Sequence, residues 1–222
     1  WCSGCASGFI LKASPDGALL WARDLDDWGV YSDNLQALSL SQTHLFTVGY
    51  TQGSYNDTST YALIAALDPA DGDLLWADTS IGHNAGTNSF NAVAAAPDGS
   101  VYAVGHTTLS NQVCNVSGYT VGATRYGTNL IGNLDALVVK FDANGTILWR
   151  HYLGGVNADS ARAVAVAPDG SVYVAGETRS SDWVSLASGS ATPANAAGFL
   201  VKLTAAGAHV WSSLLNGGGH EA

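Results

Sequence analysis

The chain repeats one pattern of apolar and polar positions. An apolar strand leads into a polar turn that ends in Gly, and a Trp stands four residues after that Gly. The copies are FILKASPDGALLW (Phe9–Trp21), ALIAALDPADGDLLW (Ala62–Trp76), ALVVKFDANGTILW (Ala136–Trp149) and FLVKLTAAGAHVW (Phe199–Trp211). Apolar segments on both sides of a short Gly-containing turn predict a β-hairpin. Because repeats determine architecture before any single residue does, the pattern predicts a repeat protein.

A second repeated phrase lies between the Trp-containing ones. It consists of an apolar strand, Pro-Asp-Gly and another apolar strand that ends in Gly. Its copies are AVAAAPDGSVYAVG (Ala92–Gly105), AVAVAPDGSVYVAG (Ala163–Gly176) and the degenerate ALSLSQTHLFTVG (Ala37–Gly49). Asp-Gly supplies the positive φ that a tight turn needs. No segment of helical period separates the phrases, so the two hairpins together predict a four-stranded antiparallel unit.

Repetition of such units around an axis predicts an all-β fold, the β-propeller built of four-stranded antiparallel blades. We expect a single propeller segment over 1–222, with a half blade at 9–25 and full blades at about 35–80, 91–153 and 161–215. Propellers close with about four to eight blades. We therefore expect the chain to be part of a larger propeller. The alternative is a short chain that borrows its missing strands from a neighbour.

The repeats resemble a known family. DALVVKFDANGTILWRHYLGG, AVAVAPDGSVYVAGET and GFLVKL are similar to the bacterial-type seven-bladed β-propeller (SBBP) repeats, most closely over Asp135–Thr178. This resemblance covers nearly the whole chain. It implies a propeller fold and an extracellular or cell-surface module, and it implies no defined activity. LDPADGDLLW (Leu67–Trp76) also resembles a quinoprotein propeller repeat, but the adjacent cysteines that such dehydrogenases carry at their cofactor do not occur here.

Charge and hydropathy limit the partners. The chain has 18 acidic and 8 basic residues and a net charge of −10. Binding of nucleic acid needs a basic surface, and anionic membranes attract one as well, so neither is an expected partner. No apolar run approaches the ~20 residues that span a bilayer, and we expect no membrane insertion. The expected partners are other protein subunits or the rest of the same chain, with glycans as a further class.

The cysteines and sequons indicate a location. Cys2, Cys5 and Cys114 are best explained as structural disulfides of a secreted protein, one partner lying outside this segment. Cys2 and Cys5 have the spacing of half a zinc site, but no second pair exists, and free thiols or redox roles stay open. Asn-x-Ser/Thr sequons at Asn56, Asn115 and Asn144 are glycosylation candidates. With the low lysine content, they favour an extracellular or cell-surface protein.

Several conspicuous residues recur with the repeat and are therefore expected to be structural. The four Trp residues should pack between neighbouring sheets, because their period equals that of the blades. The three lysines at one shared repeat position are expected to face solvent on a strand. The residues concerned are Trp21, Trp76, Trp149 and Trp211, and Lys12, Lys140 and Lys202.

Aspartates gather near the turn glycines, where an Asp side chain caps its own turn. One group of three suggests calcium, but it does not have the D-x-D-x-D-G spacing that surrounds the ion with oxygens. We therefore expect no cofactor and no dedicated metal site, and the negative charge leaves weak surface calcium binding open. The turn aspartates are Asp16, Asp98, Asp142 and Asp169, and the group of three is Asp68, Asp71 and Asp73.

The longest links should lie together at one end of the blades. They run over 51–61, 107–134 and 178–197, and rigid scaffolds carry recognition on such loops. Aromatic residues are favoured at interfaces, so this face is the candidate for partner binding. Its aromatic residues are Tyr55, Tyr119, Tyr126 and Trp183.

No motif of catalysis stands out. The sequence contains no H-E-x-x-H pattern, no G-x-S-x-G nucleophile elbow and no phosphate-binding loop, so we do not expect an enzyme. The favoured interpretation is a non-enzymatic, extracellular structural or scaffold segment of a larger surface or filament-forming protein. The alternatives are a propeller module that binds carbohydrate or protein with its long-loop face, and an enzyme that acts on polysaccharide.

Overall fold

The computed structural model describes residues 7–25, 32–54, 57–81, 86–108, 123–126, 134–180 and 196–215. In these ranges the chain forms strands and turns and no helix, and therefore no helix that could cross a membrane. The prediction of an all-β fold is confirmed.

The strands form a hairpin and three larger sheets. The N-terminal hairpin consists of β1 (Phe9–Ala13) and β2 (Leu19–Asp24). The first sheet has the order β3 (Ser32–Leu40), β4 (Leu45–Ser54), β5 (Asp57–Leu67) and β6 (Leu74–Ile81). The second sheet has the order β7 (Asn88–Ala95), β8 (Val101–Thr107), β10 (Asp135–Phe141), β11 (Ile147–Leu153) and β9 (Ala123–Tyr126). The third sheet has the order β12 (Asp159–Val166), β13 (Val172–Thr178), β14 (Ala197–Leu203) and β15 (His209–Leu215).

Strand β9 departs from the expected four-stranded blade. It lies within the link expected over 107–134 and pairs in parallel with β11, while the other neighbouring strands are antiparallel. An outer strand offers unpaired backbone N–H and C=O groups to any passing segment. Such pairing needs no alternation of apolar and polar residues, and for this reason the pattern analysis could not find β9.

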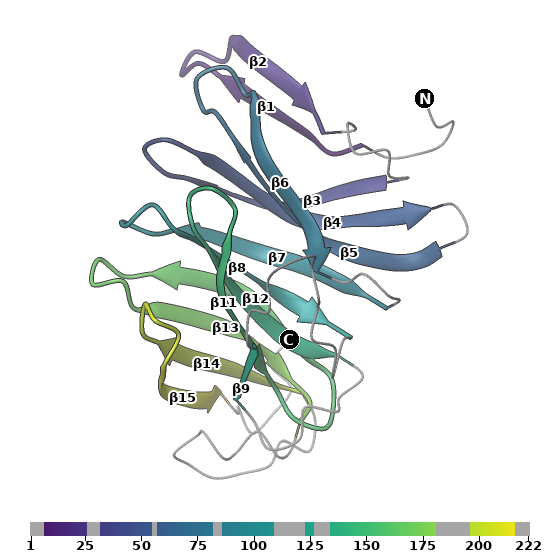
Figure 1. The fold of residues 1–222 in the computed structure, drawn as a ribbon, viewed down its shortest axis with the longest axis vertical. Helices are drawn as coiled ribbons and strands as arrows, with labels where there is room; N and C mark the ends of the chain where they lie inside the picture. Colours follow the sequence, from purple (N-terminus) through teal and green to yellow (C-terminus); the bar gives the residue numbers. More distant parts are fainter. Residues whose placement is uncertain are drawn as a thin grey trace.

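The sheets stack face to face in chain order. Figure 1 shows them along the longest axis, from the N-terminal hairpin at the top to β14 and β15 at the bottom. Successive residues of β10 enter two different cores: Leu137 and Val139 pack with the first sheet, and Ala136 and Val138 pack with the third. Four-stranded antiparallel sheets stacked in this way are propeller blades, so the predicted β-propeller architecture is confirmed.

The hairpin turns use the residues that their geometry needs. Gly145 and Gly207 have φ values of 85° and 84°, a left-handed conformation that favours glycine. In the turn before Gly145, the Asp142 carboxylate accepts hydrogen bonds from the backbone N–H groups of Asn144 at 2.9 Å and Thr146 at 2.8 Å. These bonds keep this hairpin turn in one shape, which matters because Gly145 lies against Trp76 of the preceding sheet.

Candidate functional site: the joint between sheets

Three of the recurring Trp residues lie on the turn of the following sheet. A Cβ atom placed on Gly207 would come within 3.1 Å of the Trp149 ring, closer than most Cβ contacts in proteins. The same relation recurs at 2.8 Å and 2.7 Å in the two preceding contacts. Each contact between a Trp and the next turn glycine is termed a joint here. The joints are Trp21–Gly72, Trp76–Gly145 and Trp149–Gly207.

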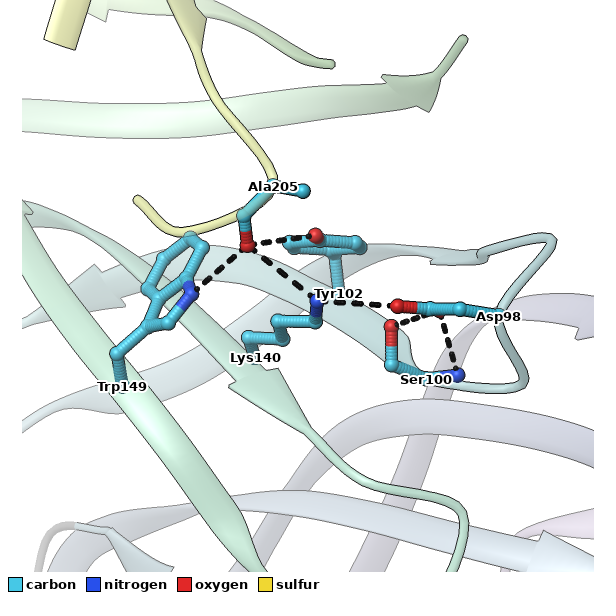
Figure 2. Close-up of polar contacts among 6 residues, drawn as sticks. All are labelled: Asp98, Ser100, Tyr102, Lys140, Trp149 and Ala205. Atoms are coloured by element: carbon cyan, nitrogen blue, oxygen red, sulfur yellow. Dashed lines mark hydrogen bonds and ion pairs between the residues drawn. The ribbon is translucent and has the colours of Figure 1, made fainter. Parts of the chain in front are cut away.

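The third joint is centred on one backbone carbonyl. Figure 2 shows three donors of the second sheet that converge on the oxygen of Ala205, which belongs to the turn between β14 and β15. Trp149 Nε1 and Lys140 Nζ each donate at 3.3 Å, and Tyr102 Oη donates at 3.4 Å. A carbonyl oxygen shared by one charged and two neutral donors holds the third sheet in a defined position on the second.

Strand register brings these donors together. Tyr102 on β8 is opposite Lys140 on β10, which in turn is opposite Trp149 on β11, so the three form one row across the sheet. The Lys140 Nζ atom lies 5.1 Å from the centroid of the Tyr102 ring, within the range of a cation–π contact. The row therefore presents three hydrogen-bond donor groups from a largely aromatic surface. The sequence pattern that could have revealed it is the Tyr shared by SVYAVG and SVYVAG.

Lys140 corrects an expectation. Its repeat position predicted a side chain in solvent, but Lys140 is only 6% exposed. The turn of the third sheet covers it, and the Asp98 carboxylate compensates its charge at 3.3 Å. A hydrogen bond from the Ser100 hydroxyl, reinforced by the Lys140 charge, lowers the pKa of the Asp98 carboxyl below its usual value. A buried lysine needs such partners, since an uncompensated charge is costly inside a protein.

The other two joints use fewer donors. Trp76 Nε1 donates to the carbonyl of Ala143 at 2.8 Å. In the first joint Lys12 Nζ donates to the carbonyl of Pro69 at 2.7 Å, and the buried Trp21 Nε1 has no acceptor among the residues that the structure describes. The first joint meets a turn that is one residue longer, DPADG in place of DANG. In all three joints the acceptor is nevertheless the carbonyl of the second turn residue, namely Pro69, Ala143 or Ala205.

A second polar cluster joins the strands near the other end of the third sheet. Asp159 begins β12 and accepts hydrogen bonds from the Gly155 N–H at 2.8 Å, the Ser180 hydroxyl at 2.7 Å and the Thr178 hydroxyl. Burial raises the pKa of the Asp159 carboxyl above its usual value, against the hydrogen bonds that lower it. The second sheet has the neutral residue Asn88 in the same place, accepting from Thr107 at 2.6 Å. The recurrence indicates a structural pair.

The acidic turns hold no cluster of ligands. Asp68 and Asp71 accept backbone hydrogen bonds from Ala70 at 2.8 Å and Asp73 at 3.0 Å within their own turn. No group of three or more His, Cys, Asp or Glu that could hold a metal ion occurs among the described residues. The carboxylates of Asp68 and Asp71 thus take part in turn formation, and that of Asp73 pairs with Arg23 at 2.8 Å.

Many predicted site residues cannot be placed. Three groups lie wholly or partly outside the described residues. They are the three cysteines Cys2, Cys5 and Cys114, the sequon asparagines Asn56 and Asn115, and the loop aromatics Tyr55, Tyr119 and Trp183. Tyr126 is the last residue of β9. Asn144 is exposed at the turn between β10 and β11, where a glycan could be attached. Glycosylation, disulfides and binding by the long loops therefore stay predictions.

The third sheet carries the same row of residues on its outward face. Tyr173, Lys202 and Trp211 are opposite one another across β13, β14 and β15. In the described part of the chain no turn glycine lies against Trp211, which is 39% exposed. One complete set of donors is thus displayed at the C-terminal end of the stack.

No family model matches the chain, and no curated protein matches its sequence. Solved structures do resemble it. The quinohemoprotein alcohol dehydrogenase from Comamonas testosteroni is similar over 94% of this chain and 34% of its own, with a TM-score of 0.50 and 14% identity. A protein of unknown function from Bacteroides caccae is similar over 96% of this chain and 59% of its own, with a TM-score of 0.43 and 9% identity. The chain spans less than two thirds of either structure. At such low identity the likeness to the dehydrogenase shows the propeller fold alone.

Proposed function

We propose that the chain is a non-enzymatic structural segment of a larger extracellular surface or filament-forming protein. The observation that carries this proposal is the joint. Residue types that elsewhere bind ligands, namely Trp, Tyr and Lys, contact a backbone carbonyl and a glycine of the next sheet. Side chains committed to contacts between sheets serve assembly, because they are covered by protein.

The resemblance to the SBBP repeats supports the proposed location. Such repeats form surface modules, and the low lysine content and the sequon at the exposed Asn144 agree with secretion. Partners in this proposal are other subunits or further blades of the same chain. The loop aromatics that would serve a carbohydrate- or protein-binding module lie largely outside the described residues, so no contact in the structure favours that alternative.

The test begins with the native protein. We would purify it from the extracellular fraction of its source and measure its intact mass after deglycosylation and its assembly state without denaturant. A polymer of this chain without denaturant supports a structural role, whereas a mass well above 22.8 kDa means that a longer chain supplies further blades and that its function must be sought in the whole protein. A native monomer of this size that retains a glycan or a protein ligand would replace the proposal by a binding module. Turnover of a panel of polysaccharides would replace it by an enzyme.

A further inference from the structure

We propose that apolar residues displayed by a β-bulge in every hairpin dock a partner segment that carries apolar side chains flanked by lysine or arginine. The inference rests on the proposed structural role and deepens it, since it names a surface of the scaffold and the chemistry of the segment that this surface holds. The residues concerned, termed the bulge residues here, are Leu20, Leu75, Leu148 and Val210.

Each bulge residue directly precedes a recurring Trp. In the second sheet Lys140 pairs with Trp149, and the next pair is Phe141 with Ile147. Leu148 therefore has no residue opposite it on β10. A bulge of this kind sets two residues against one and re-aims a side chain out of the regular alternation. The same shift in register recurs in the other three hairpins, where it leaves out Leu20, Leu75 and Val210.

The bulge keeps the side chain out of both neighbouring cores. Ile147 packs in the core between the first and second sheets, and Trp149 packs in the core between the second and third. Leu148, which stands between them, is 49% exposed.

This exposure does not depend on the ends of the chain. Leu75 and Leu148, in the two sheets that have neighbours on both sides, are 48% and 49% exposed. Val210 in the last sheet is 48% exposed and Leu20 in the N-terminal hairpin 56%. Because a following or preceding sheet leaves the value almost unchanged, the bulge residues would stay at the surface of a longer stack of blades.

Contact with water alone does not account for an apolar residue in every bulge. The position two residues earlier is also exposed in all four hairpins, and it holds Ala18, Asp73, Thr146 and Ala208, none of them a large apolar residue. Single apolar residues on a surface are ordinary, whereas apolar groups gathered on one side and rimmed by polar ones mark interaction sites. The repetition therefore indicates a surface that another molecule covers.

The bulge residues lie beside acidic turns. Each stands three residues after its turn glycine, at the beginning of an outer strand, and Figure 1 shows the turns that precede β6, β11 and β15 on the left of the stack. Asp16 and Asp71 are exposed in two of the turns, and Asp142 lies in a third. A hydrogen bond from the Ser14 hydroxyl lowers the pKa of the Asp16 carboxyl, which therefore stays ionised at neutral pH.

The basic residues near these turns already have acceptors. Lys12 donates to the Pro69 carbonyl at 2.7 Å, and Arg23 pairs with Asp73 at 2.8 Å. Lys140 is buried against Asp98. The turns thus surround the bulge residues with an excess of negative charge.

This combination determines the chemistry of the occupant. Apolar side chains would cover the leucines, and lysine or arginine beside them would complement the carboxylates, whereas an anionic lipid surface would be repelled. Stacked sheets lie about 10 Å apart, and an α-helix advances about the same distance in seven residues. A basic amphipathic segment can therefore place apolar residues on the bulges of two neighbouring sheets.

Synthetic peptides of about 14 residues, long enough to reach two sheets, provide the probe. In one peptide a helical face of Leu is surrounded by Lys. Glu replaces every Lys in the second peptide, and Gln replaces every Leu in the third. Fluorescence anisotropy of the labelled peptides with the full chain at low ionic strength should show tight binding of the Leu/Lys peptide and at least about 10-fold weaker binding of the other two.

A double variant tests the apolar part of the surface. Leu75→Ser combined with Leu148→Ser should weaken binding of the Leu/Lys peptide by about 10-fold or more, since it removes two central contacts. The matched control is Val156→Ser in the link between β11 and β12, where the side chain is 44% exposed. Binding by the control should stay within about 2-fold of wild type.

A second variant tests the charged part and leaves every apolar side chain in place. Asp71→Asn keeps the oxygen that accepts from the Asp73 N–H, so the turn retains its bond. We expect about 2- to 3-fold weaker binding at low salt and no difference at high salt, where such charges are screened. Asp24→Asn, exposed at the other end of β2, is the control.

Equal binding of the three peptides would overturn the inference, and so would binding that neither the double variant nor Asp71→Asn changes. Vesicles of phosphatidylglycerol are the remaining probe. If they bind while the Leu/Lys peptide does not, and the double variant abolishes this binding, a lipid surface replaces the basic segment as the occupant. These results leave the proposed structural role intact, because that role is tested separately by the assembly state of the native protein.

Discussion

The second and third sheets carry the same row of Tyr, Lys and Trp in different surroundings. In the second sheet Tyr102, Lys140 and Trp149 meet the turn of the next sheet through the carbonyl of Ala205. In the third sheet Tyr173, Lys202 and Trp211 face outward. Burial of a repeat residue is thus decided by whether another sheet follows. We therefore expect these side chains to stabilise the fold mainly through their contacts with the turn of the next sheet. Substitutions made in pairs, one in each row, test this expectation.

Removal of the Trp side chain should give the largest difference in stability between the two rows. We expect Trp149→Ala to lower the free energy of unfolding by about 3 kcal/mol, since a cavity would open between two sheets. Trp211→Ala should cost less than about 1 kcal/mol, as surface substitutions do. Urea denaturation of both variants in dilute solution measures the difference. Equal losses would mean that the joint contributes no more than the Trp contacts within one sheet.

A methyl group at the turn glycines should have the next largest effect. Gly207→Ala brings a Cβ to within 2.3 Å of His151 Nε2, whereas Gly17→Ala meets nothing within 4 Å at nearly the same φ. Both variants incur about 1–2 kcal/mol of backbone strain. The clash should add about 1–2 kcal/mol at Gly207 only. Thermal and urea unfolding measure the loss of stability in both variants. Equal losses at Gly207 and Gly17 would contradict a tight joint.

Loss of the repeat lysine should have a smaller effect. Lys140→Met removes a charged donor from Ala205 O but leaves Trp149 and Tyr102 bonded to it, so we expect a loss of about 1–2 kcal/mol. Lys202→Met should change stability by less than about 0.5 kcal/mol, because this side chain is partly exposed to solvent. Chemical denaturation at pH 7 compares the two. A cost at Lys202 as large as that at Lys140 would remove the distinction between the rows.

The smallest expected effect is on the pH dependence of stability. It compares Asn88 at the start of β7 with Asp159 at the start of β12. Burial raises the folded-state pKa of Asp159 above the unfolded value near 3.8. Its contribution to stability is therefore complete below pH 3.8 and is lost as pH rises through the folded pKa. Asp159→Asn should flatten this decline, and Asn88→Asp should steepen it by adding a second buried carboxyl. Unfolding free energies measured between about pH 3.5 and 7 test the sign, and unchanged slopes in both variants would contradict it.

Periodicity was enough to predict the architecture. The repeated hairpin phrases led to an all-β propeller, which the stacked sheets and the likeness to a solved propeller structure confirm. The turn glycines were also predictable, because Asp-Gly and Asn-Gly sequences favour tight turns through local backbone geometry. The specific repeat family, the location and the sites on the long loops stay predictions, since they depend on parts or partners that the described residues do not include.

The candidate site was harder to predict. Trp149 could be assigned to the packing between sheets from its period, but the convergence of Lys140 and Tyr102 on Ala205 O could not. A backbone carbonyl has no signature in sequence, since every residue carries one. Strand β9 escaped prediction for a similar reason, because backbone groups of any residue can pair with an outer strand.

Apart from β9, the sequence by itself determined the local structure: which segments are strands, where the turns fall and which residues recur in register. These properties follow from alternation and backbone conformation within a few residues of each other. Only the tertiary structure decided that Lys140 is buried and Lys202 half-buried, and that Trp149 is covered while Trp211 is exposed. The physical reason is that burial depends on the neighbouring sheet, which lies dozens of residues away along the chain and which the repeat itself cannot specify.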